Sequence, residues 1–447
     1  MRSRVLGLLR AHGFNRTSFQ ILEVGFRYWF CDDGCVAYAD TGGAWVAAGA
    51  PIASGAALAR VTAAFIASAR AEGRRACFFA TEERLLAAVP ELEAIQIGEL
   101  PIWDPAKWPD IVRSGKSLRE QIRRARAKGV SVRKLEVAEV ADPAGPARRA
   151  MEMLIRSWLS TRAMAPMGFL VDVQPFDFPE ERRYLVAERE GAIVAFLAAV
   201  PVYARRGWLI EDLLRHPTAP NGTGEMLIDQ AMRLLAGEGS HDVTLGLAPL
   251  SGSVNRWLGV ARSLGRALYD FRGVYAFKAK LKPDSWEPTY LAYPRGGSPL
   301  LRVVCMVDVL AAFARGSLSR FGFQTILRGP TVVVRTLAGL LVPWTILLAS
   351  VETRRWFPWP WVKWAWVVFD VAVVAGLFAL SSRFRPRLAR LLAIAVTLDG
   401  ILTLIEACMF NVPRLRGPAD WVVVVLACLA PASAAAVLWG AQATRTS

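Results

Sequence analysis

Residues 207–237, GWLIEDLLRHPTAPNGTGEMLIDQAMRLLAG, form the stretch from which we interpret the rest of the chain. The first residues predict a short apolar strand that ends in a charged cluster, and a turn rich in Pro, Asn and Gly follows. Apolar residues then recur at helical spacing as far as Gly237, with Thr223 as the predicted N-cap. The stretch therefore predicts a strand, a glycine loop and a helix in succession.

Such a unit suits the binding of an anion beside a pair of carboxylates. The first turn of a helix has free N–H groups and a positive dipole end, so Asn221 and Gly222 are candidates for contacting an anionic group. Glu211 and Asp212, at the end of the strand, can hold an amine or transfer a proton. In a regular strand these two side chains face opposite sides, so both line one pocket only if the strand bends or ends there.

Length and charge limit the classes of protein to consider. A chain of 447 residues is too long for one compact domain and predicts two or three. The net charge is +16, which suits nucleic acid or an anionic membrane without choosing between them. The six cysteines form no Cys-x-x-Cys pair and have no paired spacing with the three histidines. We therefore expect reduced thiols, no metal and no cofactor.

Strand and helix patterns occur twice in the same order. Residues 26–53 predict a meander of strands, after which a helix and a further strand follow. The pattern begins again with a helix near residues 147–162, then strands, the helix of the opening stretch and a strand over residues 241–250. This doubling predicts an α/β (α+β) fold with two similar lobes, residues 1–140 and 141–297.

The remaining residues predict a membrane region. Four apolar segments each approach the ~20 residues that a helix needs to cross a bilayer; they lie near residues 331–350, 361–380, 391–410 and 421–440. We expect a bundle of four transmembrane helices over residues 331–447, preceded by an interfacial segment over residues 298–330. Acidic residues within the spans are expected to face other helices; they are Asp370, Asp399 and Glu406.

Charged residues also predict the orientation of these spans. Four arginines lie between the second and third spans, which places this link and both termini on the cytoplasmic side; they are Arg383, Arg385, Arg387 and Arg390. The apolar run at the N-terminus is too short for the core of a signal peptide, so we expect the first ~300 residues in the cytoplasm.

Five motifs in a fixed order carry a resemblance to a known family. They are GKSLREQIRRARAKGV, MGFL, EDLLRHPTAPNGTGEMLID, LGLAPL and FKAKLKPDSWEPTYLAYP. Over about residues 15–297 the chain resembles the catalytic domain of phosphatidylglycerol lysyltransferases, bacterial enzymes that move an amino acid from aminoacyl-tRNA to a membrane lipid. The resemblance implies two tandem lobes of the GNAT acyltransferase type. It also implies aminoacyl-tRNA, an anionic phospholipid such as phosphatidylglycerol, and the bacterial inner membrane as partners.

Two departures limit what the resemblance implies. Relatives commonly carry a long membrane region before the catalytic domain, whereas the predicted spans of this chain follow it, so lipid flipping is not implied. The amino acid and the acceptor lipid vary among relatives, so lysine is not implied. Neither the resemblance nor the residues indicate an oligomeric state.

The resemblance also assigns roles to residues of the opening stretch. Asp212 and Arg215 occupy the D-L-x-R motif of the family, which implies that Asp212 handles the amine or the proton and that Arg215 contacts a phosphate. The alternative is an Asp–Arg ion pair that fixes the turn.

Two further groups of basic residues are candidates for substrate binding. Lys278 and Lys280 alternate along FKAKL, which we interpret as a strand, and match a basic motif of the family; the alternative is a strand edge protected by lysines. Arg119, Arg123 and Arg126 share one face of a predicted helix, which suits a tRNA backbone or lipid headgroups. The alternative is a solvated helix.

Three hypotheses about function remain. The first is a membrane-bound aminoacyltransferase that uses aminoacyl-tRNA and a phospholipid. The second is a GNAT-type N-acyltransferase that uses acyl-CoA or acyl carrier protein to make an amine-containing lipid. A typical CoA-binding loop has Gln or Arg three residues before its first glycine. This chain has Ala219 at that position, which makes the second hypothesis less favoured than the first. The third is a membrane-anchored binding module without activity.

Overall fold

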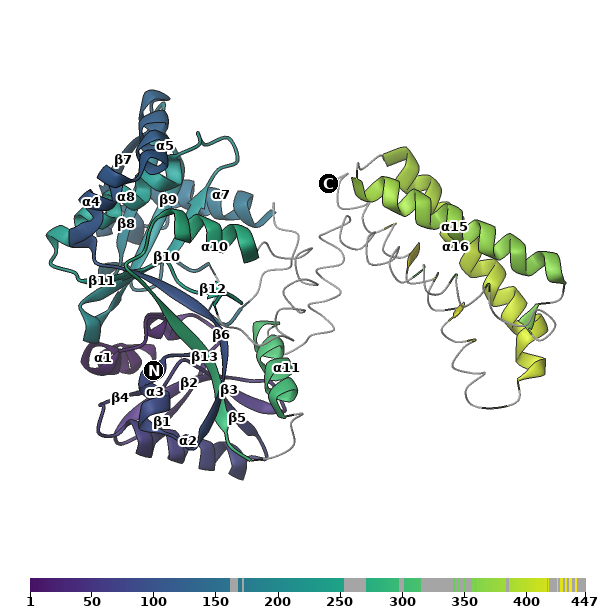
Figure 1. Ribbon diagram of the computed structural model, residues 1–447, viewed down its shortest axis with the longest axis horizontal. Coiled ribbons are helices and arrows are strands. Elements are labelled where there is room, and N and C mark those ends of the chain that lie inside the picture. The colour runs from purple at the N-terminus through teal and green to yellow at the C-terminus, as the bar shows by residue number, and fades with distance from the viewer. Residues whose placement is uncertain are drawn as a thin grey trace. The chain divides into compact units, whose positions relative to one another are not determined.

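The computed structural model describes most of the chain as two compact units (Figure 1). The first unit comprises residues 1–161 and 166–318, and the second comprises residues 162–165 and 319–447. The described ranges are 1–160, 168–170, 173–252, 271–296, 301–314, 359–382 and 386–415, with single residues between 341 and 439.

One mixed sheet organises the first unit, which confirms the predicted α/β class. Its strand order is β1-β2-β3-β5-β13-β6-β11-β10-β9-β8-β7, while β4 pairs with β2 and β12 pairs with β6. The strands are β1 (Arg27–Cys31), β2 (Gly34–Asp40), β3 (Ala44–Ala48), β4 (Ile52–Ala53), β5 (Arg75–Thr81), β6 (Leu92–Trp103), β7 (Ser131–Leu135), β8 (Arg183–Arg189), β9 (Ala192–Val202), β10 (Gly207–Arg215), β11 (Asp242–Thr244), β12 (Ala248–Pro249) and β13 (Ser285–Pro294). The pairs β3–β5 and β10–β11 are parallel.

Each half of the sheet includes a strand from the other half of the sequence. β13, near the end of the first unit, lies between β5 and β6 and pairs with both. β7, from the first third of the chain, lies at the opposite edge beside β8. The exchange joins the halves in one continuous sheet, and the division into two lobes at residue 140 stays a prediction.

Helices cover both faces of this sheet (Figure 1). They are α1 (Arg2–His12), α2 (Leu58–Ala71), α3 (Glu83–Ala88), α4 (Trp108–Ser114), α5 (Lys116–Ala127), α6 (Val137–Ala141), α7 (Pro146–Ser160), α8 (Thr223–Gly237), α10 (Phe271–Lys280) and α11 (Leu301–Phe313). Residues of α2, α4, α5 and α8 pack on one face. Residues of α1, α7 and α11 pack on the other. The sequence of β3 is apolar throughout because both faces of this strand are buried.

Alternate residues of β9 separate the two faces. Leu197 and Ala199 pack with residues of α5 and α8. Phe196 and Ala198 pack with residues of α7, and Val200 continues the same face toward α1 and α11. This alternation lets each side chain of the neighbouring strand β10 be assigned to a face.

Two predictions of strands are wrong in detail. FKAKL does not form a strand, because residues 271–280 form α10, in which Phe277 and the following Leu281 contact the same core cluster. Phe277 and Leu281 are four residues apart, which is the spacing of one helix face. Two lysines that alternate over a short segment do not distinguish a strand from a helix. The strand predicted over residues 241–250 is limited to β11 and β12, since Gly246 between them has a φ of +75°.

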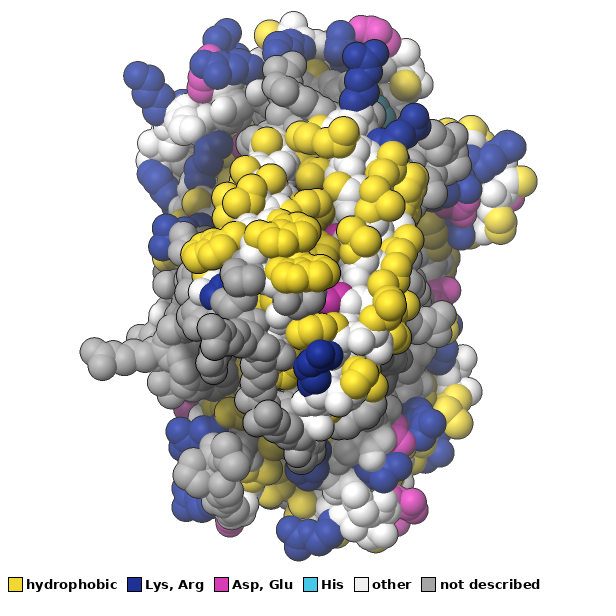
Figure 2. Space-filling view, turned by 90° about the vertical axis from the view of Figure 1, so that its right-hand side faces the viewer, with side chains coloured by type: hydrophobic (Ala, Val, Ile, Leu, Met, Phe, Trp, Pro, Cys, Tyr) yellow, Lys and Arg dark blue, Asp and Glu magenta, His cyan; other side chains and the backbone are white. Residues whose placement is uncertain are grey.

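Among the described residues of the second unit, two helices are long and apolar enough to cross a membrane, α15 (Pro360–Ser382) and α16 (Pro386–Glu406). Hydrophobic side chains gather over them in Figure 2. They pack closely, since a Cβ at Gly376 would lie 2.8 Å from a Leu392 methyl group. They match the second and third predicted spans; residues 331–350 and 421–440 lie almost entirely outside the described residues.

Acidic side chains of the second unit contact neighbouring segments. Asp370 of α15 accepts a 3.4 Å hydrogen bond from Thr345. Glu406 of α16 accepts one of 3.0 Å from Trp366 Nε1 of α15. These two contacts agree with the expectation for Asp370 and Glu406, because polar groups among apolar helices need partners. The third residue, Asp399, accepts a 3.4 Å hydrogen bond from Thr403 of its own helix, so its contact with another helix stays a prediction.

Candidate functional site

A β-bulge in β10 brings the two candidate carboxylates to one face of the sheet. Ile210 pairs with Ala199 of β9, whereas Asp212 pairs with the next residue, Ala198, so Glu211 is the extra residue. Asp212 therefore lies on the face of Ala198, which packs with α7. The bend that sequence reasoning required for a shared pocket is present.

The neighbours in β10 give the same assignment. Glu211 follows Leu209 by two residues, and Asp212 precedes Leu214 by two residues. Leu209 and Leu214 both belong to the face of α1 and α7. Because side chains alternate on each side of the bulge, both carboxylates lie on this face.

Arg182, just before β8, binds Glu211 of this pair. It donates from Nη1 to the Glu211 carboxylate, and their side chains are 2% and 4% exposed. Its Nε donates to the carbonyl of Asp177 at 2.9 Å, and its guanidinium lies 5.2 Å from the centre of the Phe19 ring. Sequence reasoning missed Arg182, because no motif marks it and only the fold brings it to β10.

The two carboxylates keep Arg182 charged. Burial alone would lower the pKa of Arg182, but the charges of Glu211 and Asp212 raise it overall, so the guanidinium stays charged. Asp212 is only 5% exposed. Two carboxylates and one guanidinium therefore lie buried at this end of β10.

Arg215 is not brought together with Asp212. It pairs with Ala195 of β9 and so lies on the opposite face of β10, where it is exposed. Its Nη1 donates to the carbonyl of Ala219 at 3.3 Å and braces the turn. The turn is therefore fixed by Arg215 through a backbone carbonyl, and the Asp–Arg ion pair considered above does not describe this geometry.

The loop before α8 is shaped by close packing with α5. Gly222 has a φ of +96°, and a Cβ there would lie 2.0 Å from the carbonyl oxygen of Gln121 in α5. The N-cap of α8 is Gly222 and not Thr223, whose Oγ1 donates instead to the carbonyl of Pro220 at 2.7 Å. Asn221 is exposed beside this contact. Gly222 thus has a packing role, and its predicted role in substrate binding stays a prediction.

Helix α5 presents the predicted basic face. Leu118 and Ile122 are buried against α8, whereas the arginines of the motif, Arg119, Arg123 and Arg126, are exposed. Arg123 pairs with Glu120 of the same helix at 2.8 Å, and Arg119 donates to the carbonyl of Val112 at 3.3 Å. The basic helix therefore lies directly over the loop that begins α8.

The two lysines of α10 have different environments. Lys278 is buried, and its Nζ donates to the carbonyls of Gly246 and Leu247 at 2.7 and 2.8 Å. Burial lowers the pKa of Lys278 to about 7. Lys280 pairs with Glu225 in the first turn of α8 at 3.0 Å. The lysines thus bring together the motifs LGLAPL, FKAKLKP and the opening stretch.

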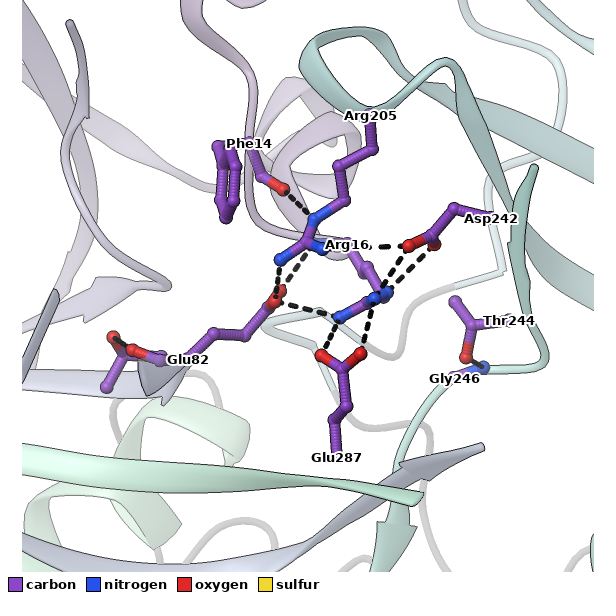
Figure 3. A network of polar contacts seen from close by, with 9 residues as sticks. Phe14, Arg16, Glu82, Arg205, Asp242, Thr244, Gly246 and Glu287 are labelled. Atoms are coloured by element: carbon purple, nitrogen blue, oxygen red, sulfur yellow. Dashed lines mark hydrogen bonds and ion pairs between the residues drawn. The ribbon is translucent and has the colours of Figure 1, made fainter. Parts of the chain in front are cut away.

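A buried polar network joins distant segments of the first unit (Figure 3). Arg16, with a side chain that is 1% exposed, binds Glu82 after β5, Asp242 of β11 and Glu287 of β13 at 2.6–2.9 Å. Arg205 binds the same Glu82 at 2.6 Å. This network was also missed from the sequence. Among the described residues no group of three or more His, Cys, Asp or Glu side chains could hold a metal ion.

With this geometry established, comparison with known proteins is informative. Residues 7–293 match the family described as phosphatidylglycerol lysyltransferase, C-terminal. The chain belongs to this family. A phosphatidylglycerol lysyltransferase of Bacillus subtilis is 36% identical over 118 residues, which are 24% of this chain and 14% of that protein. The lysylphosphatidylglycerol biosynthesis bifunctional protein LysX of Mycobacterium marinum is 25% identical over 250 residues, 51% of this chain and 21% of LysX.

Two solved structures share the fold of this chain. L-PGS from Bacillus licheniformis superposes with a TM-score of 0.59 at 23% identity, over 70% of this chain and 96% of that one. A C-terminal DUF2156 domain from Agrobacterium fabrum gives a TM-score of 0.61 at 22% identity, over 71% and 98%. The match to the curated relatives covers about a fifth or less of their lengths. The comparisons therefore establish family and fold, and the activity of this chain is a separate proposal.

Proposed function

We propose that the chain is a membrane-bound aminoacyltransferase that moves an amino acid from aminoacyl-tRNA to the headgroup of an anionic phospholipid, with phosphatidylglycerol as the acceptor. The observation that carries the proposal is the β10 bulge, which puts Glu211 and Asp212 on one face beside Arg182. The names of the relatives, which include a phosphatidylglycerol lysyltransferase, support the lipid acceptor.

The reaction is an exchange of esters. A hydroxyl oxygen of the lipid attacks the ester carbonyl of aminoacyl-tRNA, the bond from that carbonyl to the tRNA ribose oxygen breaks, and the proton of the hydroxyl passes to the ribose oxygen. The amino acid carries an ammonium group next to the reacting carbonyl. Glu211 and Asp212 share one face of the sheet, and we assign these carboxylates to holding that ammonium in position.

The oxyanion that develops on the ester carbonyl needs a positive charge or an N–H donor beside it. We assign this role to Lys278, whose buried Nζ donates to the carbonyls of Gly246 and Leu247. We assign to Asp212 the orientation of the amine or of the proton. Arg215, at the loop before α8, and Lys280 of α10, beside the first turn of α8, are assigned to phosphate groups.

The partners follow from the surfaces of the two units. The exposed arginines of α5 suit the phosphate backbone of tRNA. α15 and α16, as the second and third of four proposed spans, anchor the chain in the bacterial inner membrane. The arginines between the proposed second and third spans favour a multi-pass arrangement with the catalytic residues in the cytoplasm.

Lipid extracts from cells expressing the protein test this proposal. Mass spectrometry should reveal phosphatidylglycerol with an added mass of one amino acid, and cells with Asp212→Asn should lack it. The exposed Asp110 of α4 offers a matched control, because Asp110→Asn makes the same chemical change at a side chain that is 73% exposed. A fatty-acyl increment on an amine-containing lipid would instead indicate an N-acyltransferase, and unchanged lipids would refute both activities.

A further inference from the structure

Helix α11 is attached to the sheet by one side and exposes apolar residues on the other. Its buried residues include Cys305, Val309 and Ala312, which pack in the core cluster that includes β3 and β5. The exposed apolar residues of its other side are Val303, Val304, Val307 and Leu310, at 51%, 37%, 46% and 51%. Spacings of four and three residues place 303, 307 and 310 in one stripe along the helix. We call these four residues the α11 stripe.

Polar and aromatic contacts fix this orientation of α11. Asp308, on the buried side, forms a bidentate ion pair with Arg75 at the start of β5, with distances of 2.9–3.1 Å. At the end of the helix, the ring of Phe313 lies 5.2 Å from Phe79 and 5.5 Å from Phe169. Turning the stripe inward would break these contacts, so the stripe faces outward in the folded unit.

Exposed apolar residues are otherwise scattered over the first unit. Outside α11, the large apolar side chains exposed on its described residues belong to separate segments; they are Met1, Val24, Val137, Met153 and Tyr275. Single exposed apolar residues are ordinary, whereas a contiguous group is a sign of an interaction surface.

The sequence around the stripe indicates a lipid surface. α11 ends at Phe313, and from residue 319 the chain belongs to the second unit, whose described residues include α15 and α16, helices able to cross a membrane. Arg302, which pairs with Glu93 at 3.6 Å, precedes the stripe with its side chain 52% exposed, and Arg315 and Arg320 follow in the sequence. At the surface of an anionic membrane, basic side chains contact the headgroups and an apolar helix face is buried among the acyl chains.

We propose that the α11 stripe lies on the surface of an anionic lipid bilayer and holds the first unit against it. α11 packs on the same face of the sheet as Leu209 of β10, which is the face of Glu211 and Asp212. The contact thus places lipid on the side of the sheet where the carboxylates lie. This inference rests on the proposed membrane location but not on the proposed transfer reaction.

Photo-crosslinking in the full-length protein tests the α11 stripe. The photoreactive residue p-benzoylphenylalanine replaces Val307 in one variant and Leu310 in another, in nanodiscs of phosphatidylglycerol and phosphatidylethanolamine without aminoacyl-tRNA. Met153 of α7, which is 60% exposed, is the matched control position. Mass spectrometry of the irradiated protein should find lipid adducts at positions 307 and 310, at least about tenfold above position 153.

Three outcomes would overturn the proposal. Crosslinks from position 307 to residues 315–358 of the same chain would show that the chain itself covers the stripe, and crosslinks between two copies would show a dimer interface. Equal lipid labelling at positions 153 and 307 would show no preferred contact. Since no transfer occurs in this experiment, its result is independent of whether the protein aminoacylates lipid.

Discussion

Arg182 donates a hydrogen bond to Glu211 inside the protein, where the two side chains are 2% and 4% exposed. The two residues are 29 positions apart, on strand β10 and on the segment that leads into β8. The bulge after Ile210 adds Asp212 to the face on which Glu211 meets Arg182. A buried pair is costly to break because the remaining charge has no solvent around it.

Arg182→Gln is therefore expected to lower the free energy of unfolding of the first unit by about 3–5 kcal/mol, the usual effect of removing one partner of a buried ion pair. Thermal unfolding of the purified protein in detergent measures the change. Arg183→Gln is the matched control, because Arg183 pairs with Glu238 near the surface and an exposed pair contributes about 1 kcal/mol or less. Equal effects of the two substitutions would contradict the assignment. The double variant Arg182→Gln, Glu211→Gln should regain part of the stability but no transfer activity.

Gly222→Ala is expected to destabilise the protein more than an alanine at another glycine with positive φ. At Gly222 the new Cβ would lie 2.0 Å from the Gln121 carbonyl, whereas Gly239, with a φ of +75°, has no atom within 4 Å of that position. Gly239→Ala should cost about 1 kcal/mol from backbone strain alone. Thermal unfolding should therefore show a clearly larger loss for Gly222→Ala, and similar losses would mean that α5 does not press on this loop.

Lys278 predicts a dependence of stability on pH. Its pKa is lowered from 10.5 to about 7 because burial disfavours the charged form. Between pH 7 and about 10 the unfolded state then binds more protons than the folded state at this residue. Its contribution therefore makes the protein more stable as pH rises through this range. The melting temperature, measured at pH 7, 8.5 and 10, should therefore rise less with pH in Lys278→Met than in the unaltered protein. An unchanged pH dependence of the melting temperature would show that Lys278 does not titrate in this range.

The exposed arginines of α5 predict salt-dependent binding of tRNA. Arg119→Gln with Arg126→Gln should weaken binding and lower the slope of log K against log salt, since each phosphate contact contributes about 0.7–0.9 to that slope. Filter binding of aminoacyl-tRNA at several salt concentrations measures both quantities. Arg60→Gln on α2, at a side chain that is 67% exposed, is the control and should leave the slope unchanged. An unaltered slope in the double variant would show that tRNA does not bind at these arginines of α5.

Sequence reasoning predicted the parts of the site that depend on local pattern. The strand, glycine loop and helix of residues 207–237 appear as β10, the loop and α8, because apolar periodicity determines such elements. It also stated the bend that Glu211 and Asp212 would require. It could not locate the bend, since a bulge is set by pairing with β9, whose register is a long-range property.

Contacts between distant segments could not be predicted from the sequence. Nothing near Arg182 or Arg16 indicates their partners, because Glu211, Asp242 and Glu287 are brought to them only by the order of strands in the sheet. The alternation of Lys278 and Lys280 predicted a strand, but the two residues lie in the helix α10. Lys278 is buried there, whereas Lys280 pairs with Glu225. Tertiary packing overrides a short alternating pattern.

The central claim is that the bulged strand β10 forms a site for aminoacyl transfer to lipid. The direct measurement incubates the purified full-length protein with radiolabelled aminoacyl-tRNA and vesicles containing phosphatidylglycerol, and follows the label in the lipid phase. Asp212→Asn should reduce the initial rate by about 100-fold or more while Asp110→Asn leaves it unchanged. Label in the lipid at equal rates for Asp212→Asn and the unaltered protein, or no lipid label with any aminoacyl-tRNA, would contradict the account.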